Sequence, residues 1–308
     1  DSPTKIFSWA VQPPSKGPCH LRMAIAKLCN EETLNSTTVL SVCCPSVMNR
    51  KACGIFGEDR ISNGDAAKPF QFPWMALLRN ETHFVCGGTL ISARYVLTAA
   101  HCTVNKNIVS VRLGENDINQ DLDCIVLDDE KDCAPPPQNI AVEKIIQHRY
   151  GDWRENDIAL LRLQEAAIFN HSVNTICLPD GTPGLREPLS YIVSGWGLTE
   201  NGTSFDVLRY AFVPSVSLDR CQSINYFRLF QAGVELGKSH ICAGGVDRID
   251  SCSGDSGGPL QYISGRTSRF VQQGIVSFGI KSCGKRSLPG VYTNVAHFIN
   301  WIFEHVDE

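Results

Sequence analysis

Residues 250–259 read Asp-Ser-Cys-Ser-Gly-Asp-Ser-Gly-Gly-Pro. The glycines around Ser256 allow backbone N–H groups to approach a reacting carbonyl closely. A serine hydroxyl is a poor nucleophile at neutral pH, and it needs an adjacent base that is itself oriented by a third group. The stretch therefore predicts a nucleophile at Ser256, provided that the rest of the chain supplies those two partners.

Two remote stretches supply such partners. Residues 96–102 read Val-Leu-Thr-Ala-Ala-His-Cys, so an apolar run ends at His101 beside a cysteine. Asp157 opens another apolar run at residues 156–161, Asn-Asp-Ile-Ala-Leu-Leu. The chain order His, Asp, Ser is that of the chymotrypsin-type catalytic triad. A buried His, a turn Asp and a Gly-rich loop are each common, but the three in this order are specific.

Composition bounds the class of protein. The 308 residues suffice for one large domain and a small one, and 43% hydrophobic residues is ordinary for a globular protein. The net charge of −4 gives no case for nucleic acid or an anionic membrane as partner. No apolar run approaches the ~20 residues of a membrane span. The chain starts at Asp1 without an apolar signal segment, so we expect any targeting peptide to be absent already.

The 14 cysteines are the strongest compositional fact. They are even in number and dispersed, and they lack the paired Cys-x-x-Cys spacing of a metal site. Such a set predicts seven disulfides in a secreted protein. Four Asn-x-Ser/Thr glycosylation sequons agree with that compartment: Asn35, Asn80, Asn170 and Asn201.

The hydrophobic pattern predicts an all-β domain after residue 60. Short apolar or alternating runs recur between Gly, Pro and Asn residues, which is typical of many short strands. These runs lie at residues 74–78, 88–91, 109–113, 140–146, 158–163, 190–194 and 274–277. The final run, Val295 to Val306, has helical spacing and predicts a C-terminal amphipathic helix.

From Ile61 to about Val306 the chain resembles a trypsin-like member of the chymotrypsin family. The resemblance implies two six-stranded antiparallel barrels with the active cleft between them. His101 and Asp157 would come from the first barrel and Ser256 from the second. The resemblance also pairs cysteines: Cys53 with Cys177, Cys86 with Cys102, Cys221 with Cys242, and Cys252 with Cys283. Cys124 and Cys133 remain, nine residues apart in one loop, and we expect them to pair locally.

The N-terminal segment resembles a clip domain, the small disulfide module that precedes many arthropod serine proteases. Its Val-Cys-Cys-Pro ending at residues 42–45 carries the resemblance. A full clip has six cysteines, whereas only four precede the connector here, for which we expect Cys19–Cys44 and Cys29–Cys43. The alternative is an ordinary disulfide-stapled propeptide. The predicted organisation is a clip-like module at 1–45, a linker at 46–60 and a protease domain at 61–308.

The resemblance implies the chemistry of each site residue. His101 would be the general base for Ser256, Asp157 would orient it, and the N–H groups of Gly254 and Ser256 would form the oxyanion hole. Asp250 would lie at the bottom of the S1 pocket, where a desolvated carboxylate requires a cation. Cleavage should therefore follow Arg or Lys. Three further residues would shape this pocket: Ser251 as a hydrogen-bonding group, and Gly279 and Gly290 as its open walls.

Arg60-Ile61 is the expected activation junction. In the family, cleavage before the isoleucine frees an α-ammonium that pairs with the Asp preceding the catalytic Ser, here Asp255. Ser62 and Asn63 depart from the usual Ile-Val-Gly-Gly, and this puts the packing of the new terminus in doubt. The junction implies a zymogen and an upstream activator of trypsin-like specificity. The alternative is that residues 59–60 are only an exposed linker.

A loop after residue 113 suggests a structural calcium site. Side chains of Glu115, Asp117 and Asp123, with the backbone carbonyl of Gln120, would supply the oxygen ligands that Ca²⁺ prefers. The loop resembles the calcium loop of trypsin-like enzymes. The alternative is a solvated acidic loop. Catalysis itself is expected to need no cofactor.

The expected function is that of a secreted serine endopeptidase in arthropod haemolymph. The resemblance points to innate-immune cascades, either prophenoloxidase activation for melanisation or processing of a Toll-pathway ligand. A protein substrate is implied, a downstream zymogen or pro-cytokine, together with a serpin as inhibitor. Two alternatives are a non-catalytic clip-bearing cofactor, against which the complete triad argues, and a digestive or venom trypsin.

Overall fold

A computed structural model describes most of the chain. The described residues are 8–10, 27–34, 37–43, 53–56, 66–127, 130–148, 155–179, 188–197, 206–224, 235–245, 255–278 and 288–307. The first three of these ranges are described by their backbone. Among the described residues, no helix has the length and apolar character needed to cross a membrane.

The first barrel is built from the N-terminal half of the expected protease domain. Six strands close in the order β10-β11-β6-β5-β4-β7, and every neighbouring pair is antiparallel. The strands are β4 (Met75–Arg79), β5 (Phe84–Ser92), β6 (Tyr95–Thr98), β7 (Ser110–Leu113), β10 (Gln138–Gln147) and β11 (Ala159–Leu163). Each apolar run predicted in this half of the domain overlaps one of them.

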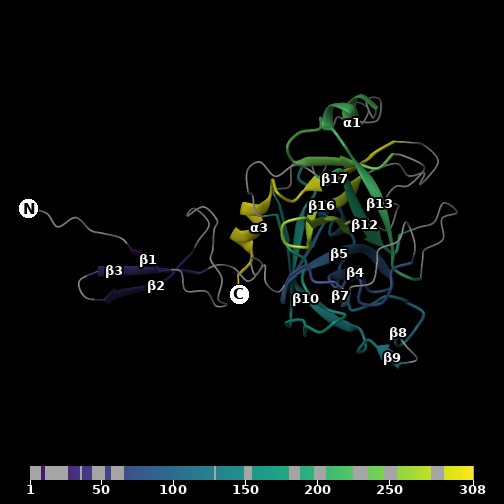
Figure 1. Cartoon of the computed structure of the whole chain (residues 1–308), viewed down its shortest axis with the longest axis horizontal. Helices are drawn as coiled ribbons and strands as arrows, with labels where there is room; N and C mark the ends of the chain where they lie inside the picture. The colour runs from purple at the N-terminus through teal and green to yellow at the C-terminus, as the bar shows by residue number, and fades with distance from the viewer. Residues whose placement is uncertain are drawn as a thin grey trace, which may run out of the picture.

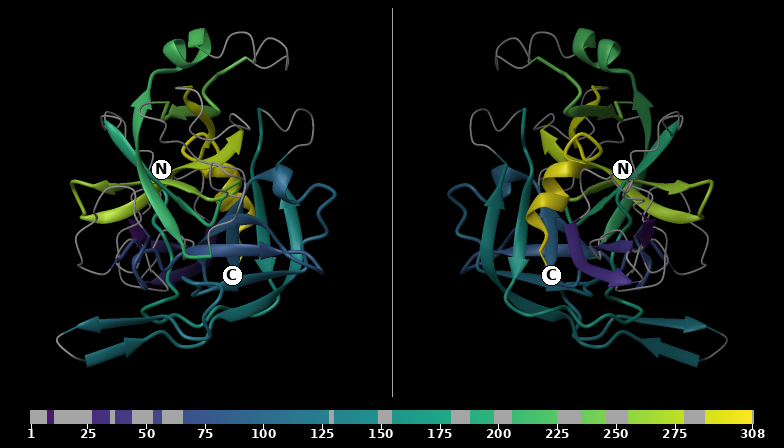
Figure 2. Two further views of the ribbon diagram at one scale, coloured as in Figure 1. Left: turned by 90° about the vertical axis from the view of Figure 1, so that its right-hand side faces the viewer. Right: turned by 90° about the vertical axis from the view of Figure 1, so that its left-hand side faces the viewer.

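The second barrel closes in the order β12-β13-β14-β17-β16-β15, again with antiparallel neighbours. Its strands are β12 (Ser190–Gly195), β13 (Arg209–Val216), β14 (His240–Ala243), β15 (Pro259–Ser264), β16 (Arg269–Phe278) and β17 (Gly290–Asn294). The two closed barrels confirm the predicted fold class. The two views of Figure 2 show the strands of both barrels curving around their interiors.

The barrels are joined by one buried interface. Trp74, which is fully buried before β4, donates its indole N–H to Gln261 Oε1 on β15 at 2.8 Å. The amide of Gln261 in turn donates to Ser194 Oγ at 3.0 Å. Because a buried polar group without a partner is costly, these bonds fix how the barrels meet. The active-site residues lie at this meeting of the two barrels.

Four short elements decorate the barrels (Figure 1). They are the 3-10 turn η2 (Ala100–Cys102), the hairpin β8 (Cys124–Leu127) with β9 (Glu130–Cys133), α1 (Leu218–Ile224) and α3 (Ile299–His305). The predicted C-terminal helix begins four residues later than expected. Asn294 explains the delay, because its side-chain oxygen accepts the N–H of Ala296 at 3.2 Å and its carbonyl accepts that of His297 at 3.1 Å.

The N-terminal segment forms a separate small sheet with strand order β1-β3-β2. Its strands are β1 (Ser8–Ala10), β2 (Lys27–Leu34) and β3 (Thr37–Cys43). Strand β1 runs parallel to β3, whereas β2 is antiparallel to it. Cys29 and Cys43 therefore lie on paired strands, and the expected Cys19–Cys44 bond falls outside the described residues.

Four disulfides are present among the described residues, and they have the expected pairing. They are Cys53–Cys177, Cys86–Cys102, Cys124–Cys133 and Cys221–Cys242. The first spans 124 residues and ties the segment before the predicted activation junction to the protease domain. The third closes the β8–β9 hairpin at its base. The expected Cys252–Cys283 bond lies outside the described residues.

Candidate active site

His101 lies on η2, directly after the buried strand β6. Its ring Nδ1 is 2.7 Å from Asp157 Oδ2, and its backbone N–H donates to Asp157 Oδ1 at 2.9 Å. The carboxylate can only accept, so the ring donates from Nδ1 and its Nε2 is left as the basic nitrogen. The side chain of His101 is 22% exposed, whereas that of Asp157 is completely buried. The imidazole is thus fixed on one edge and open to solvent on the other.

Asp157 is held by both barrels. It precedes β11 of the first barrel, but Ser277 on β16 of the second barrel donates to its Oδ2 at 2.5 Å. Thr293 on β17 donates its hydroxyl to the Asp157 carbonyl at 2.8 Å. These hydrogen bonds replace the water that the buried carboxylate would otherwise bind. Sequence reasoning missed Ser277 and Thr293, whose only signal was a hydroxyl within a buried strand.

Ser256 occupies a glycine turn that is pressed against the first barrel. Its carbonyl accepts the N–H of Gly87 on β5 at 2.8 Å and lies 3.5 Å from Cys102 Sγ. Gly257 has φ of +82°, and a side chain there would collide with Thr98 Oγ1 and with the Gly87 carbonyl. Glycine is therefore required at position 257 for the turn to dock. The docking brings the backbone of Ser256 against the disulfide that adjoins His101.

Asp255 is enclosed by two glycines at the end of β12. Gly197 donates its N–H to Asp255 Oδ1 at 2.9 Å. A Cβ at Gly197 would lie 2.5 Å from both carboxylate oxygens, and one at Gly195 would be closer still to Oδ1. The carboxylate thus has a fitted place beside the backbone of residues 195–197.

Of the remaining predicted residues of the oxyanion hole, the S1 pocket and the activation junction, only Gly290 is among the described residues. Gly290 begins β17, is buried, and pairs with Ala243 on β14. It therefore lies on the second barrel, and its role as a wall of the S1 pocket stays a prediction. The other predicted residues of the oxyanion hole, the S1 pocket and the activation junction lie outside the described residues: Gly254, Asp250, Ser251, Gly279, Arg60 and Ile61.

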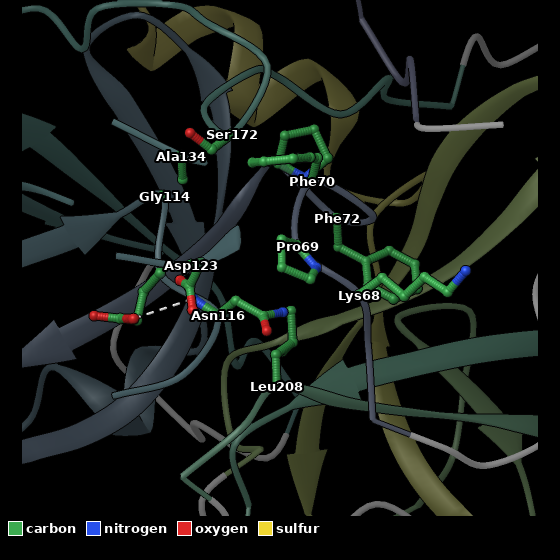
Figure 3. A pocket seen from close by; sticks show the side chains of 12 residues that line it. Lys68, Pro69, Phe70, Phe72, Gly114, Asn116, Asp123, Ala134, Ser172 and Leu208 are labelled. Carbon is green, nitrogen blue, oxygen red and sulfur yellow. Dashed lines mark hydrogen bonds between the residues drawn. The ribbon is translucent and has the colours of Figure 1, made fainter. Parts of the chain in front are cut away.

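The predicted calcium loop holds two buried carboxylates (Figure 3). Asp123 accepts the N–H groups of Asn116 and Asp117 at 2.8 and 3.0 Å. Glu115 is ion-paired with Arg112, Nη1 to Oε2, at 3.0 Å. Burial, followed by the neighbouring Asp123, raises the pKa of Glu115, and burial raises the pKa of Asp123. Two neighbouring buried carboxylates are oxygen donors of the kind that a divalent cation such as Ca²⁺ prefers.

The side chain of Asp117 fits that set less well. Asp117 uses both carboxylate oxygens inside the loop, accepting the N–H of Asn119 at 3.1 Å and the side-chain amide of Gln120 at 2.7 Å. Its side chain therefore closes a turn. Of the three predicted side-chain ligands, the buried pair Glu115 and Asp123 fits a cation best, and the predicted carbonyl ligand of Gln120 stays a prediction.

Asn116 links this loop to the start of the protease domain. Its side-chain amide donates to the Ala67 carbonyl at 3.1 Å, and its own carbonyl accepts from Trp196 Nε1 at 3.0 Å and from the N–H of Leu208 at 2.8 Å. A cavity of about 10 Å³, roughly the room for one water, lies beside it between Pro69 and the loop (Figure 3). The loop is thus hydrogen-bonded to Ala67, six residues beyond Ile61 of the predicted activation junction.

Two of the four glycosylation sequons are described, and they share one geometry. Asn80 Oδ1 accepts the backbone N–H and the hydroxyl of Thr82 at 2.9 and 3.2 Å. Asn170 Oδ1 accepts the same two groups of Ser172 at 2.8 and 2.9 Å. Each asparagine lies in a turn with its oxygen occupied by the sequon hydroxyl. Asn35 and Asn201 lie outside the described residues.

Comparison with known proteins identifies the family. Residues 61–302 match the family model described as Trypsin. The chain is 44% identical over 265 residues to "Serine protease grass" of Drosophila melanogaster, covering 81% of this chain and 68% of the relative. It is 37% identical over 286 residues to "Phenoloxidase-activating factor 3" of Holotrichia diomphalia, covering 86% and 80%.

A solved structure agrees with both relatives. The crystal structure titled as the Drosophila Grass clip serine protease of the Toll pathway aligns with a TM-score of 0.72 at 40% identity, covering 90% of this chain and 83% of that one. The family model, the relatives and the solved structure all indicate a trypsin-like protease. The hydrogen bond between His101 and Asp157 agrees with that family. The chain therefore belongs to the trypsin family and is a serine endopeptidase of the arthropod clip-domain type.

Proposed function

We propose that this chain is a secreted zymogen that, once cleaved between Arg60 and Ile61, cleaves other proteins after Arg or Lys in an arthropod innate-immune cascade. The observation that carries the proposal is the 2.7 Å bond between His101 Nδ1 and the buried carboxylate of Asp157. A histidine held in this way presents a basic Nε2 at the meeting of the barrels, where the Ser256 turn docks.

Catalysis follows from these contacts. His101 Nε2 takes the proton of Ser256 Oγ as that oxygen attacks the carbonyl carbon of the scissile peptide. The same proton then passes to the leaving amine, and water repeats the cycle to release the acyl group. Asp157 stabilises the transient imidazolium, and the N–H groups of Gly254 and Ser256 stabilise the oxyanion.

Specificity for Arg or Lys rests on Asp250, six residues before Ser256 in the chain. At the bottom of an S1 pocket the carboxylate of Asp250 would be desolvated, and without a cation this would be costly, so the pocket would select a positively charged side chain. Ser251 supplies a second polar group, and Gly279 and Gly290 leave space for a long aliphatic stem. The buried place of Gly290 on β17 supports its role as a wall.

Activation rests on Asp255. Its carboxylate lies against glycines 195 and 197, and the new α-ammonium of Ile61 would supply its counter-charge. Asn116 supports a link between the new terminus and the Asp255 region. It is hydrogen-bonded to Ala67, only six residues beyond Ile61, and it accepts the indole N–H of Trp196, which precedes Gly197. The disulfide Cys53–Cys177 would keep the N-terminal segment attached after cleavage.

The partners follow from the relatives. One relative is named for phenoloxidase activation and a solved relative for the Toll pathway, which supports a downstream zymogen or pro-cytokine as substrate. An activator of trypsin-like specificity would cut at Arg60, and a serpin would end the activity. Disulfides and two sequons in turns support secretion into haemolymph with glycans at Asn80 and Asn170.

A structural Ca²⁺ belongs to the proposal through Glu115 and Asp123. A bound cation would neutralise two buried acids and would hold the loop that Asn116 connects to Ala67. No catalytic step uses it. The proposal therefore predicts an effect of Ca²⁺ on stability in the first place.

Controlled cleavage tests the proposal. The chain is cut at Arg60-Ile61 by a protease of trypsin-like specificity, which is then removed, and the product is assayed with Arg-, Lys- and Phe-amide substrates. We expect hydrolysis of the Arg and Lys substrates only, and none by an Arg60→Gln variant, which resists the cut. Equal hydrolysis of the Phe substrate, or full activity without cleavage, would contradict the proposal.

A further inference from the structure

A groove beside the active site is not used by the triad. It has a volume of about 610 Å³ and is lined by two segments of the first barrel, residues 80–85 and residues 105–107. The first segment is the turn that leads into β5, and the second follows η2, which carries His101. One side of the groove is therefore formed by the segment that follows the element carrying His101.

Lys106 places a cation in this groove close to the reacting groups. Its Nζ lies 3.4 Å from Cys86 Sγ, and Cys86 is bonded to Cys102, whose Sγ lies 3.8 Å from His101 Nε2. These contacts put the ammonium within roughly 10 Å of the ring, the span of about three extended residues at ~3.3 Å each. The long-range attraction of Asp157 on the Lys106 ammonium agrees with that proximity.

The charge of Lys106 is unbalanced locally. Among the described residues, Lys106 forms no ion pair with a carboxylate, and its hydrogen bond is to sulfur, a weak acceptor. Burial, outweighing the attraction of Asp157, lowers the pKa of Lys106, as expected for an ammonium that lacks an anionic partner. The other ionisable groups of the groove have polar partners: Glu81 Oε1 accepts from Asn107 at 3.0 Å, and His83 contacts Thr82 at 2.7 Å.

The groove is connected to the Ser256 turn through one disulfide. Lys106 contacts Cys86 Sγ, Cys86 is bonded to Cys102, and Cys102 Sγ lies 3.5 Å from the Ser256 carbonyl. The groove belongs to the first barrel, whereas Gly290, the expected S1 wall residue, belongs to the second. A peptide cut by Ser256 can therefore place a residue close to the cleaved bond in the groove, and the inference assigns this place to the residues after the cut.

We propose that Lys106 is a specificity-determining residue that selects an Asp or Glu among the first three residues after the cleaved bond. The inference rests on the proposed cleavage after Arg or Lys. Among the proposed substrates, it favours a protein with an acidic residue just beyond the cut over a zymogen that continues with the usual Ile-Val-Gly-Gly. The partly buried ammonium gains a partner when the acidic side chain binds. Because one face of the pair stays in solvent, the preference is moderate, about three- to tenfold.

Quenched fluorescent peptides test the proposal on the full chain after cleavage at Arg60. All carry Arg before the cut, and each of the three following positions is varied in turn as Glu, Gln or Lys. The ratio of kcat/KM for the Glu peptide to that for the Gln peptide is compared between the wild type, Lys106→Gln and Lys106→Glu. Lys131→Gln, an exposed lysine on β9, is the matched control. The assays are repeated after enzymatic removal of glycans, because Asn80 lines the groove.

We expect a three- to tenfold preference for Glu in the wild type and in Lys131→Gln, no preference in Lys106→Gln, and a preference for Lys in Lys106→Glu. The wild-type preference should also shrink at high salt. Equal rates for Glu and Gln peptides in the wild type, or a preference that survives Lys106→Gln, would overturn the inference. Failure to hydrolyse an Arg-amide, which has no residue after the cut, would instead count against the proposed function.

Discussion

Ser277 on the second barrel and His101 on the first share one oxygen of Asp157, with distances of 2.5 and 2.7 Å to Oδ2. This oxygen joins the two barrels at the point where catalysis occurs. Asp157 is completely buried, so these partners replace the water that a carboxylate would otherwise bind.

Replacing Ser277 with Ala should lower activity without unfolding the chain. One charge-assisted hydrogen bond to Asp157 is lost, so we expect kcat/KM on an Arg-amide to fall about tenfold. Ser277→Thr keeps the hydroxyl and should recover part of that loss if β16 has room for the methyl group. A Ser277→Ala variant with unchanged kcat/KM across the pH range would show that the oxygen does not need this donor.

Gly197→Ala should prevent activation although the chain can still be cut at Arg60. The added Cβ would lie 2.5 Å from both oxygens of Asp255 and would displace the carboxylate that the new terminus pairs with. A displacement of about 1 Å near catalytic groups can cost ~10² in rate, and we expect a loss of that order in kcat/KM after cleavage. Gly265→Ala is the control, because its Cβ would meet no atom within 4 Å. Equal activity of the two variants would contradict this prediction.

Calcium should stabilise the protein through Glu115 and Asp123. Binding to the folded state at about ten times the Kd contributes about 1.4 kcal/mol, which raises the thermal midpoint by roughly 3–6 °C for a domain of this size. Differential scanning calorimetry with millimolar Ca²⁺ against chelator measures the shift. Asp123→Asn should abolish it, whereas Lys131→Gln should keep it. An unchanged midpoint in the wild type would leave the loop as a hydrogen-bonded structure without a cation.

The C-terminus should depend on pH through Tyr95 and Asp307. The phenol of Tyr95 donates to the Asp307 carboxylate, and this bond lowers the pKa of Asp307 below its ordinary 3.8, whereas burial, with the same bond, raises that of Tyr95 above 10.0. A lowered acid contributes stability above its ordinary pKa and loses it as the pH falls through the lowered value; a raised phenol contributes stability below 10.0 and loses it as the pH rises further. The bond should therefore stabilise the fold between pH of about 4 and 10.

Comparison of the wild type with Tyr95→Phe tests this window. We expect the variant to melt about 1–2 °C lower at pH 7, with a difference that narrows toward pH 2. His305→Gln, a change on α3 that leaves both groups intact, is the control. A difference that stays constant down to pH 2 would assign the effect to packing rather than to the ionised carboxylate.

The sequence predicted most of what depends on local pattern. The runs of alternating and apolar residues predicted seven of the twelve barrel strands, because those strands bury at least one face. The motifs around His101, Asp157 and Ser256 were recognised from the chemistry that a serine nucleophile requires. Ser277 and Thr293 could not be predicted in this way, because their contact with Asp157 arises only when remote strands pair. The late start of α3 depends on Asn294, whose side chain competes locally with the helix.

The calcium loop shows another limit. The sequence identified the acidic residues of this loop, but it could not tell which of them are available to a cation. In the structure Asp117 accepts hydrogen bonds from amides of the loop itself, whereas Glu115 and Asp123 are buried. Lys106 carried no signal in the sequence, because its significance comes from a disulfide and a groove formed by two separate segments.

Covalent labelling of the activated protein by an organophosphate tests the central claim most directly. The reagent reacts with a serine whose hydroxyl is deprotonated by a positioned base, and mass spectrometry of the digested protein locates the adduct. The account predicts one adduct, on Ser256, that disappears in His101→Ala and is strongly reduced in Asp157→Asn. An adduct on another serine, or equal labelling of Ser256 in the absence of the imidazole, would contradict it.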